Sequence, residues 1–208
     1  MTNYPALATA LAVLFAGASS AAAPPASKPA VAKPAAAATS APAAHYRQAP
    51  GATLTFTFDQ AGAQNRGSFG QFTTLLSYDE KNPAAGSLDV TVQMASLDTQ
   101  DKDRNDTLAS AELLDTKQYP TARYTAGSFS RTADGGLQAV GKLTLRGVTR
   151  DLRVPLAIRR TGAGLEISGE VTLKRLDYGV GQGEWKSTEW VGDDVKLQYK
   201  VPLVTAKP

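Results

Sequence analysis

The residues that most often act as nucleophiles and general bases are nearly missing from this chain of 208 residues. It contains no cysteine and a single histidine, His45. Nucleophilic catalysis by serine, threonine or cysteine needs a general base beside the nucleophile, and that base is most often histidine. His45 stands at the end of a segment rich in alanine and proline, where a solvated side chain is the favoured interpretation. We therefore predict no catalytic triad.

Four acidic residues form the densest group that could hold a metal ion: Asp98, Asp101, Asp103 and Asp106. Without cysteine or clustered histidine, only a site built from oxygen ligands is open to this chain. The spacing lacks the glycine and the closing glutamate of a calcium-binding loop. The cluster is interpreted as the solvated start of a helix, and we predict neither a metal site nor a cofactor.

A third group combines carboxylates with tryptophan in a glycine-rich stretch near the end of the chain. Glu184 and Glu189 lie beside Trp185 and Trp190, and Asp177 precedes them. Because paired carboxylates can hydrolyse glycosidic bonds, one hypothesis is a hydrolase acting on sugars or small apolar substrates at this loop. The favoured alternative is a hairpin loop whose tryptophan rings pack on the end of the fold.

The elements that position these groups occupy only part of the chain. Residues 6–18 form an uncharged apolar run too short to span a bilayer comfortably, and residues 21–23 offer a cleavage site. The alanine- and proline-rich residues that follow predict a disordered linker. We predict a signal peptide over residues 1–23, a linker over 24–48 and one folded domain over 49–208. A periplasmic or secreted protein without stable membrane insertion is expected.

The charge of the folded domain is balanced. The chain has 22 basic and 19 acidic residues. Lys28, Lys33 and Arg47 precede the first acidic residue, Asp59, so the 19 remaining basic residues face 19 acidic ones. A domain that binds nucleic acid has a net basic charge or a clustered basic stripe. Because the sequence shows neither, nucleic acid is not expected as a partner.

Apolar residues at every second position dominate the folded domain. This period of two places alternate side chains on opposite faces of a strand. It predicts strands at residues 53–58, 68–79, 87–94, 122–130, 137–145, 152–158, 165–173 and 195–204. The second of these shifts its register near Phe72, which suggests a bulge. Residues 60–67, with two glycines, are interpreted as a turn or an irregular strand entry.

Residues 101–115 break the pattern with apolar residues at roughly helical spacing, which predicts a short helix capped by Asp101 or Thr99. Hairpin turns are predicted at residues 134–136 and 161–164. Long strands with hairpin connections favour a barrel over a sandwich. The predicted fold class is all-β, an antiparallel barrel of about eight strands with a short helical insertion. Such a barrel either holds one small ligand or fills its lumen with side chains.

Several short segments, read in order, resemble the YceI-like family of polyisoprenoid-binding, lipocalin-like proteins of the bacterial periplasm. They are Gly67-Ser68-Phe69 with Phe72, and residues 95–99 (ASLDT), 104–115 (RNDTLASAELLD), 119–124 (YPTARY), 141–149 (GKLTLRGVT) and 174–179 (KRLDYG). The resemblance covers the whole folded region. It implies a long lipocalin-like barrel with a helical insertion, a lumen for an isoprenoid-type lipid or quinone, and a homodimer.

The chain departs from the family's pattern at several positions. Where family members often carry histidine, this chain has Gln60, Thr107 and Arg146. Asn105 replaces a usual aspartate, and Leu113-Leu114 replaces a usual pair of phenylalanines. Any family function that depends on those histidines is therefore not carried over to this chain.

An apolar lumen suits a long apolar guest, because each buried CH₂ contributes about 0.8 kcal/mol without any hydrogen bond. We predict a carrier that holds a polyisoprenoid or an isoprenoid quinone in this lumen, and not an enzyme. The residues predicted to line the lumen are Leu54, Phe56, Phe58, Phe69, Val90, Val92, Leu143, Leu145, Leu152, Leu156, Ile167, Val171, Leu197 and Tyr199. Gly70, Gly141 and Gly169 lie within strand patterns, where glycine marks either a bend or space for the guest.

Four residues are predicted at the rim of the barrel: Arg175, Asp177, Trp185 and Trp190. Arg175 and Asp177 are expected to form an ion pair that closes the barrel, the alternative being contact with the head group of a guest. A third hypothesis for the whole domain is a barrel with a solid core that works as an interaction module.

Overall fold

The computed structural model describes residues 44–206. The predicted signal peptide and most of the predicted linker lie outside the described residues. The strands are β1 Ala44–Gln48, β2 Thr53–Gln60, β3 Ala63–Phe69, β4 Phe72–Tyr78, β5 Ser87–Gln93, β6 Leu97–Asp98, β7 Thr121–Arg131, β8 Leu137–Leu145, β9 Val148–Thr161, β10 Gly164–Lys174 and β11 Val191–Thr205. The α-helix of this part of the chain, α1, spans Lys102–Ala109 and lies between β6 and β7.

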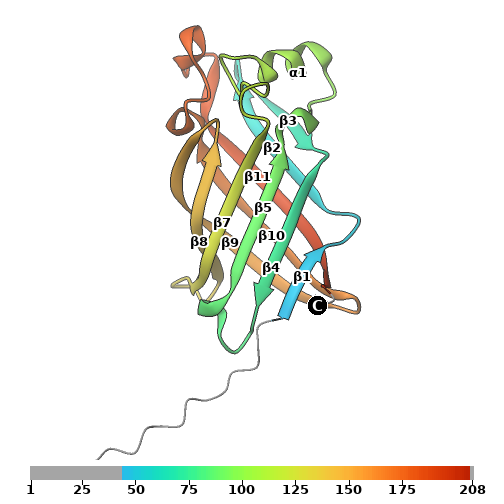
Figure 1. The fold of residues 1–208 in the computed structure, drawn as a ribbon. Helices are drawn as coiled ribbons and strands as arrows, with labels where there is room; N and C mark the ends of the chain where they lie inside the picture. Colours follow the sequence, from blue (N-terminus) through green and yellow to red (C-terminus); the bar gives the residue numbers. More distant parts are fainter. Residues whose placement is uncertain (1–43, 207–208) are drawn as a thin grey trace, which may run out of the picture. The chain divides into compact units, whose positions relative to one another are not determined.

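The barrel has eight strand positions, because β1 to β6 fill three of them, two strands to a position. β1 and β2 both pair with β11 and share the first position. β4 pairs with β1 and β3 pairs with β2 at the second position; β5 pairs with β4 and β6 pairs with β3 at the third. From there β7 to β11 follow one another, and β11 returns to β1 (Figure 1). The predicted fold class, an antiparallel barrel of about eight strands with a helical insertion, is confirmed.

The strand predicted over residues 68–79 is divided close to the expected register shift. β3 ends at Phe69, and β4 begins at Phe72. Between them, the N–H of Gly70 donates to the carbonyl of Ser96 at 3.0 Å, and the N–H of Gln71 donates to its hydroxyl at 3.0 Å. The polar segment 60–67 is less irregular than predicted, because β3 already begins at Ala63.

The folded domain begins earlier than predicted. β1 starts at Ala44, and Tyr46 pairs with Leu76 on one side and Thr205 on the other. The predicted boundary at residue 49 is therefore wrong, because the barrel closes only through β1. The sequence of β1, AHYRQ, has no apolar alternation that could have predicted a strand. His45 is an exposed residue of this strand.

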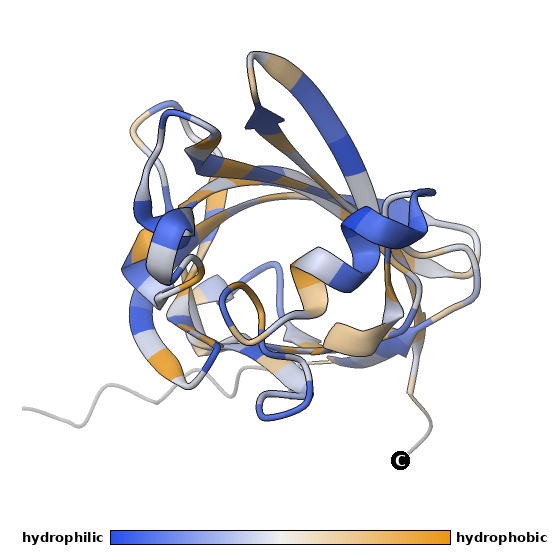
Figure 2. Cartoon of the chain, turned by 90° about the horizontal axis from the view of Figure 1, so that it is seen from above, coloured by the Kyte–Doolittle hydropathy of each residue, from blue (hydrophilic) through white to orange (hydrophobic). Residues whose placement is uncertain are grey.

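The predicted helix begins where expected and ends early. Asp101 caps it, and its carboxylate accepts the N–H of Arg104 at 3.0 Å. Beyond Ala109 the chain continues in turns up to β7. With the loop over residues 175–190, this segment lies at one end of the barrel, which we call the loop end (Figures 1 and 2). None of the helices within residues 44–206 is long and apolar enough to cross a membrane.

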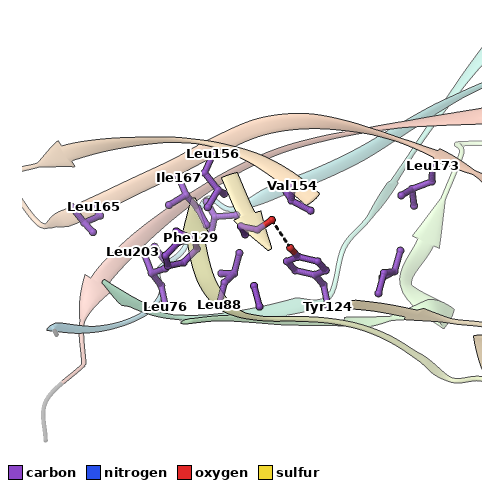
Figure 3. Packing of buried hydrophobic residues seen from close by; sticks show 14 of the residues in the cluster. Leu76, Leu88, Tyr124, Phe129, Val154, Leu156, Leu165, Ile167, Leu173 and Leu203 are labelled. Carbon is purple, nitrogen blue, oxygen red and sulfur yellow. Dashed lines mark hydrogen bonds between the residues drawn. The ribbon is translucent and has the colours of Figure 1, made fainter. Parts of the chain in front are cut away.

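The opposite end, which carries the turns between β4 and β5 and between β7 and β8, is called the hairpin end (Figure 1). Its interior is filled with side chains that are almost completely buried. Leu76, Leu165, Ile167 and Leu203 are between 1% and 3% exposed. Figure 3 shows these residues packed around Phe129. The barrel is therefore solid at the hairpin end.

Of the three glycines predicted to lie within strands, Gly141 and Gly169 allow another group to approach closely. A Cβ at Gly141 would lie 2.2 Å from the carbonyl oxygen of Thr125, beside the bulge between β7 and β8. A Cβ at Gly169 would lie 2.2 Å from the hydroxyl of Tyr199. Gly70 has no such neighbour, since the nearest atom would be 3.8 Å away, and it marks the break between β3 and β4.

Candidate functional site

The barrel encloses two adjoining cavities. The outer cavity, of about 170 Å³, lies under the loop end, and the inner cavity, of about 110 Å³, lies deeper in the barrel. Five residues line both cavities and are called the junction residues: Leu54, Val92, Ala122, Leu143 and Leu197. The two cavities therefore meet inside the barrel and form one interrupted lumen.

All fourteen residues predicted to line the lumen lie on the walls of these cavities. Phe56, Phe58, Phe69 and Leu145 line the outer cavity; Val90, Leu152, Leu156, Ile167, Val171 and Tyr199 line the inner cavity; Leu54, Val92, Leu143 and Leu197 line both. The alternation sufficed for this placement because it assigns every second residue to the inner face. That these residues contact a guest stays a prediction. Gly70, Gly141 and Gly169 line neither cavity in the described structure, so they do not make room for a guest.

The roof of the outer cavity comes from the helical insertion. Leu108 in α1, and Leu113 and Leu114 in the turns after it, line this cavity. The N–H of Leu114 donates to the carbonyl of Leu108 at 3.0 Å, which folds the turn back under the helix. Sequence reasoning assigned these leucines to a helix but not to the site. The feature that could have assigned them to the site is the apolar face of this short helix, which needs a buried surface to pack against.

A few polar side chains interrupt this apolar roof. Gln60, Arg104 and Thr107 line the outer cavity, and Arg104 lies 3.6 Å from the carboxylate of Asp101. With Arg175, which also lines it, the outer cavity therefore carries two guanidinium groups and two neutral polar groups among walls that are otherwise apolar.

Arg175 does not form the predicted ion pair with Asp177 within the described residues. It is 4% exposed and lines the outer cavity from below the loop. Its guanidinium donates five hydrogen bonds of 2.7–3.1 Å to the backbone carbonyls of Val180, Trp185, Ser187, Val191 and Gly192. Burial lowers the pKa of Arg175, and the nearby charge of Asp193 opposes this shift. The prediction was wrong because the loop turns its carbonyls inward, where only a many-donor side chain can satisfy them.

Asp177 itself faces solvent. Its backbone carbonyl accepts a hydrogen bond from Nε of Arg150 at 2.6 Å. At the rim of the barrel, Arg150 and Arg175 thus both donate to main-chain carbonyls, whereas the charge pair of this region joins Lys174 and Asp194.

The tryptophans and glutamates of the loop do not gather around one cavity in the described residues. Trp185 lines the outer cavity, whereas Trp190 is 69% exposed. Glu184 and Glu189 are exposed, and neither lines a cavity in the described part of the chain. A hydrolase of the predicted kind needs two carboxylates facing each other across a bound sugar, and this loop does not hold its carboxylates in a cleft.

The acidic residues near α1 serve the local backbone. Asp98 accepts the N–H of Gln100 at 2.8 Å and the amide of Asn105 at 3.2 Å, and both bonds lower the pKa of its carboxyl. Asp106 pairs with Lys102 on the helix surface. In residues 44–206 no three histidine or acidic side chains lie close enough to share a metal ion.

Comparison with known proteins agrees with this geometry. The family model described as YceI-like domain matches residues 46–203. The chain belongs to the YceI-like domain family. Protein YceI of Escherichia coli O17:K52:H18 is 36% identical over 116 residues, which are 52% of this chain and 60% of that protein. The chain thus matches less than two thirds of the length of this relative.

Two solved structures share the barrel of this YceI-like domain. Burkholderia cenocepacia BcnA is 29% identical with a TM-score of 0.70, covering 74% of this chain and 96% of that one. A polyisoprenoid binding domain from Saccharophagus degradans, implicated in plant cell wall breakdown, is 16% identical with a TM-score of 0.62. That comparison covers 79% of this chain and 99% of the other, and it supports the fold alone.

Two departures from the family's sequence pattern face the lumen of this YceI-like domain. Gln60 and Thr107, at positions where family members often carry histidine, both line the outer cavity. Arg146, the third such residue, instead donates to the carbonyl of Ala111 at 2.7 Å. The mouth of this lumen therefore carries no imidazole within the described residues.

Buried tyrosines make the YceI-like barrel sensitive to alkaline pH. Burial raises the pKa of Tyr124 and of Tyr199 far above the ordinary value of about 10, and the neighbouring Tyr124 adds to the shift of Tyr199. The hydroxyl of Tyr199 donates to the carbonyl of Pro155, and that of Tyr124 donates to Ala139 and Leu152. Both phenols are therefore held in the neutral form.

We expect the melting temperature to fall as the pH rises above about 10. Above about pH 10 the two tyrosines lose their protons in the unfolded chain but keep them in the folded chain. Their contribution to the free energy of unfolding is therefore fully present below that pH and is lost as the pH rises further. The double variant Tyr124→Phe/Tyr199→Phe should show a shallower fall than the wild type between pH 9 and 11. Thermal melts followed by circular dichroism measure both slopes, and equal slopes would contradict the assignment.

Proposed function

We propose that this protein binds an isoprenoid-type lipid in its barrel lumen and acts as a carrier or sequestering protein, without catalysing a reaction. The observation that carries the proposal is the pair of adjoining apolar cavities inside a closed barrel. A solid core would have left no such space, and a filled lumen is found only at the hairpin end. The hypothesis of a purely solid interaction module therefore has no support at the loop end.

The walls suit a hydrocarbon chain better than a polar substrate. Apart from a few polar groups at the mouth and on the inner wall, the lining consists of leucine, valine, isoleucine, phenylalanine and alanine with one methionine and one tryptophan. Each CH₂ moved from water into such a lumen contributes about 0.8 kcal/mol, so ten buried groups suffice for tight binding without specific contacts. An isoprenoid repeats one branched apolar unit, which matches a wall without periodic polar groups.

The size of the cavities sets how a long chain enters. An apolar protein cavity of about 150 Å³ holds one benzene molecule, and the outer cavity is close to this size. A guest of several isoprene units therefore has to push the junction residues into other rotamers to occupy both cavities. Leu54, Leu143 and Leu197 at the junction are flexible enough for this, because leucine has more than one favourable rotamer.

The family and its relatives support the same ligand class. The chain belongs to the YceI-like domain family, and a protein with the same fold from Saccharophagus degradans is described as a polyisoprenoid binding domain. A polyprenol and an isoprenoid quinone are both consistent with the walls. The apolar run at residues 6–18 and the small residues at 21–23 support export, so we place the function in the periplasm or outside the cell.

Native mass spectrometry of the protein purified from an exporting bacterial host tests this proposal. We expect a population heavier than the polypeptide by the mass of one lipid, and an organic extract that contains an isoprenoid. Addition of farnesol to delipidated protein should produce a one-to-one complex. Protein that emerges free of lipid and also fails to bind added farnesol would refute the proposal.

A further inference from the structure

Two buried polar atoms on the adjacent strands β1 and β4 have no hydrogen-bond partner. In residues 44–206 four buried side-chain nitrogen or oxygen atoms are unpartnered, and Oγ1 of Thr74 is the one whose residue lines a cavity. Thr74 is 1% exposed and lies among Leu88, Val90 and Tyr124. A second unpartnered atom is Oε1 of Gln48. An unsatisfied buried polar group is costly, so a pair of them in one place calls for an explanation.

These two residues are neighbours on the inner face of the barrel. Gln48 pairs with Leu203, and Thr74 stands two residues before Leu76; both leucines belong to the solid core. The register that places Arg47 opposite Leu75 brings Gln48 opposite Thr74 at the next step. Side chains at directly opposite positions have Cβ atoms about 4.5–5.5 Å apart. The two oxygens are nevertheless not bonded to each other.

The chemistry of the pair is set by the rest of the Gln48 side chain. Its Nε2 donates to the carbonyl of Phe72 at 3.0 Å, which leaves Oε1 as a pure acceptor. The Thr74 hydroxyl can donate and accept. Rotation about χ1 of Thr74 can turn its oxygen toward the cavity without breaking any bond, because that oxygen has none to lose. An acceptor beside a donor is complementary to one hydroxyl group, which gives a proton to Gln48 and receives one from Thr74.

We propose that Thr74, which lines the inner cavity, and Gln48 on the adjacent strand form a hydroxyl-binding subsite, so that the guest is an apolar alcohol such as a polyprenol or a quinol. This inference rests on the proposed function. The hydroxyl enters first, and the hydrocarbon tail extends past the junction residues into the outer cavity. A quinone carbonyl satisfies Thr74 alone, and a hydrocarbon satisfies neither group. The subsite therefore ranks guests by the oxygen at their buried end.

The test compares three guests that share one carbon skeleton. Farnesol donates and accepts, farnesyl methyl ether only accepts, and farnesene does neither. Their affinities for the delipidated protein are measured by displacement of the neutral fluorophore 1-N-phenylnaphthylamine. We expect the wild type to bind farnesol about tenfold more tightly than farnesene, with the ether in between, as one or two buried hydrogen bonds imply.

The variant Thr74→Val removes the hydroxyl and keeps the shape of the side chain. It should lose about five- to tenfold in affinity for farnesol and bind farnesene as the wild type does. Thr74→Ser should retain the preference for the alcohol. The matched control is Thr73→Val, which makes the same change at an exposed neighbour on the outer face of β4. Gln48→Leu should abolish the difference between farnesol and its ether.

A melting curve without guest gives a second readout. Because the Thr74 hydroxyl has no partner in the described structure, Thr74→Val should raise the melting temperature by about 2–4 °C. Equal binding of farnesol by wild type and Thr74→Val would overturn the subsite while leaving lipid binding intact. Failure of the wild type to bind any of the three guests would overturn both the subsite and the proposed function.

Discussion

Replacing Ala122 by leucine is expected to weaken binding of an isoprenoid guest at least about tenfold while the barrel stays folded. Ala122 is 8% exposed and lines both cavities at their junction. Three additional carbon atoms there separate the inner cavity from the outer one. Every CH₂ of the guest excluded from the inner cavity removes about 0.8 kcal/mol, so the loss of two or more reduces the affinity at least about tenfold.

Stability distinguishes this variant from one in the solid part of the barrel. The added carbons of Ala122→Leu enter existing space, so the melting temperature should stay constant or rise. Ala139→Leu makes the same change at the hairpin end, where Ala139 is 0% exposed. Overpacking there should cost about 1–3 kcal/mol. Chemical denaturation and fluorophore displacement on both variants measure the contrast, and equal destabilisation by the two would show that the junction is not hollow.

Replacing Arg175 by methionine is expected to destabilise the domain by about 3–5 kcal/mol. The substitution keeps the length and apolar character of the stem but leaves five inward-facing carbonyls of residues 180–192 without their donor. Each unsatisfied buried acceptor costs about 1–3 kcal/mol, and relaxation of the loop toward solvent recovers part of the total. Urea denaturation measures the free energy of unfolding.

The loop pinned by Arg175 also carries a wall of the outer cavity. Val180 and Trp185 line that cavity. Binding of a guest should therefore shift the tryptophan emission to the blue by less in Arg175→Met than in the wild type. Arg175→Lys should be intermediate, because an ammonium has three donors and lacks the planar fork. The matched control is Arg150→Met, which removes a single exposed bond to the carbonyl of Asp177 and should change stability by less than about 0.5 kcal/mol. A small effect at both arginines would show that the loop does not depend on Arg175.

The alternation of apolar residues predicted the inner face of the barrel well and its closure poorly. In the row Val195, Leu197, Tyr199, Val201 and Leu203 every side chain faces the interior, as a period of two requires. β1 escaped prediction because a strand that closes a barrel is held by main-chain bonds to two neighbours, and these bonds leave no pattern in its side chains. It closes the barrel by pairing with β4 on one side and with β11 on the other.

The sequence predicted which residues lie at the rim of the barrel but not which partners Arg175 bonds there. Trp185 and Arg175 were placed at the mouth, and both line the outer cavity. The partner predicted for Arg175 was the carboxylate two residues away, whereas the structure supplies carbonyls up to seventeen positions along the chain. Nearest charges in sequence are easily counted, but the direction in which a loop turns its carbonyls depends on its three-dimensional path.

The amino-acid sequence by itself determined the class of this protein: a barrel of antiparallel strands with an apolar interior, few groups for catalysis, and a short helix inserted before the fourth predicted strand. Local periodicity and composition are enough for that, because they depend on residues close together in the chain. Only the tertiary structure decided that the interior is solid at one end and hollow at the other. It also decided that Gln48 and Thr74, twenty-six positions apart, lie on adjacent strands, each with an unpartnered oxygen. The reason is physical. A cavity exists where the side chains of distant strands do not fill the volume that these strands enclose together, and no single strand sets that volume.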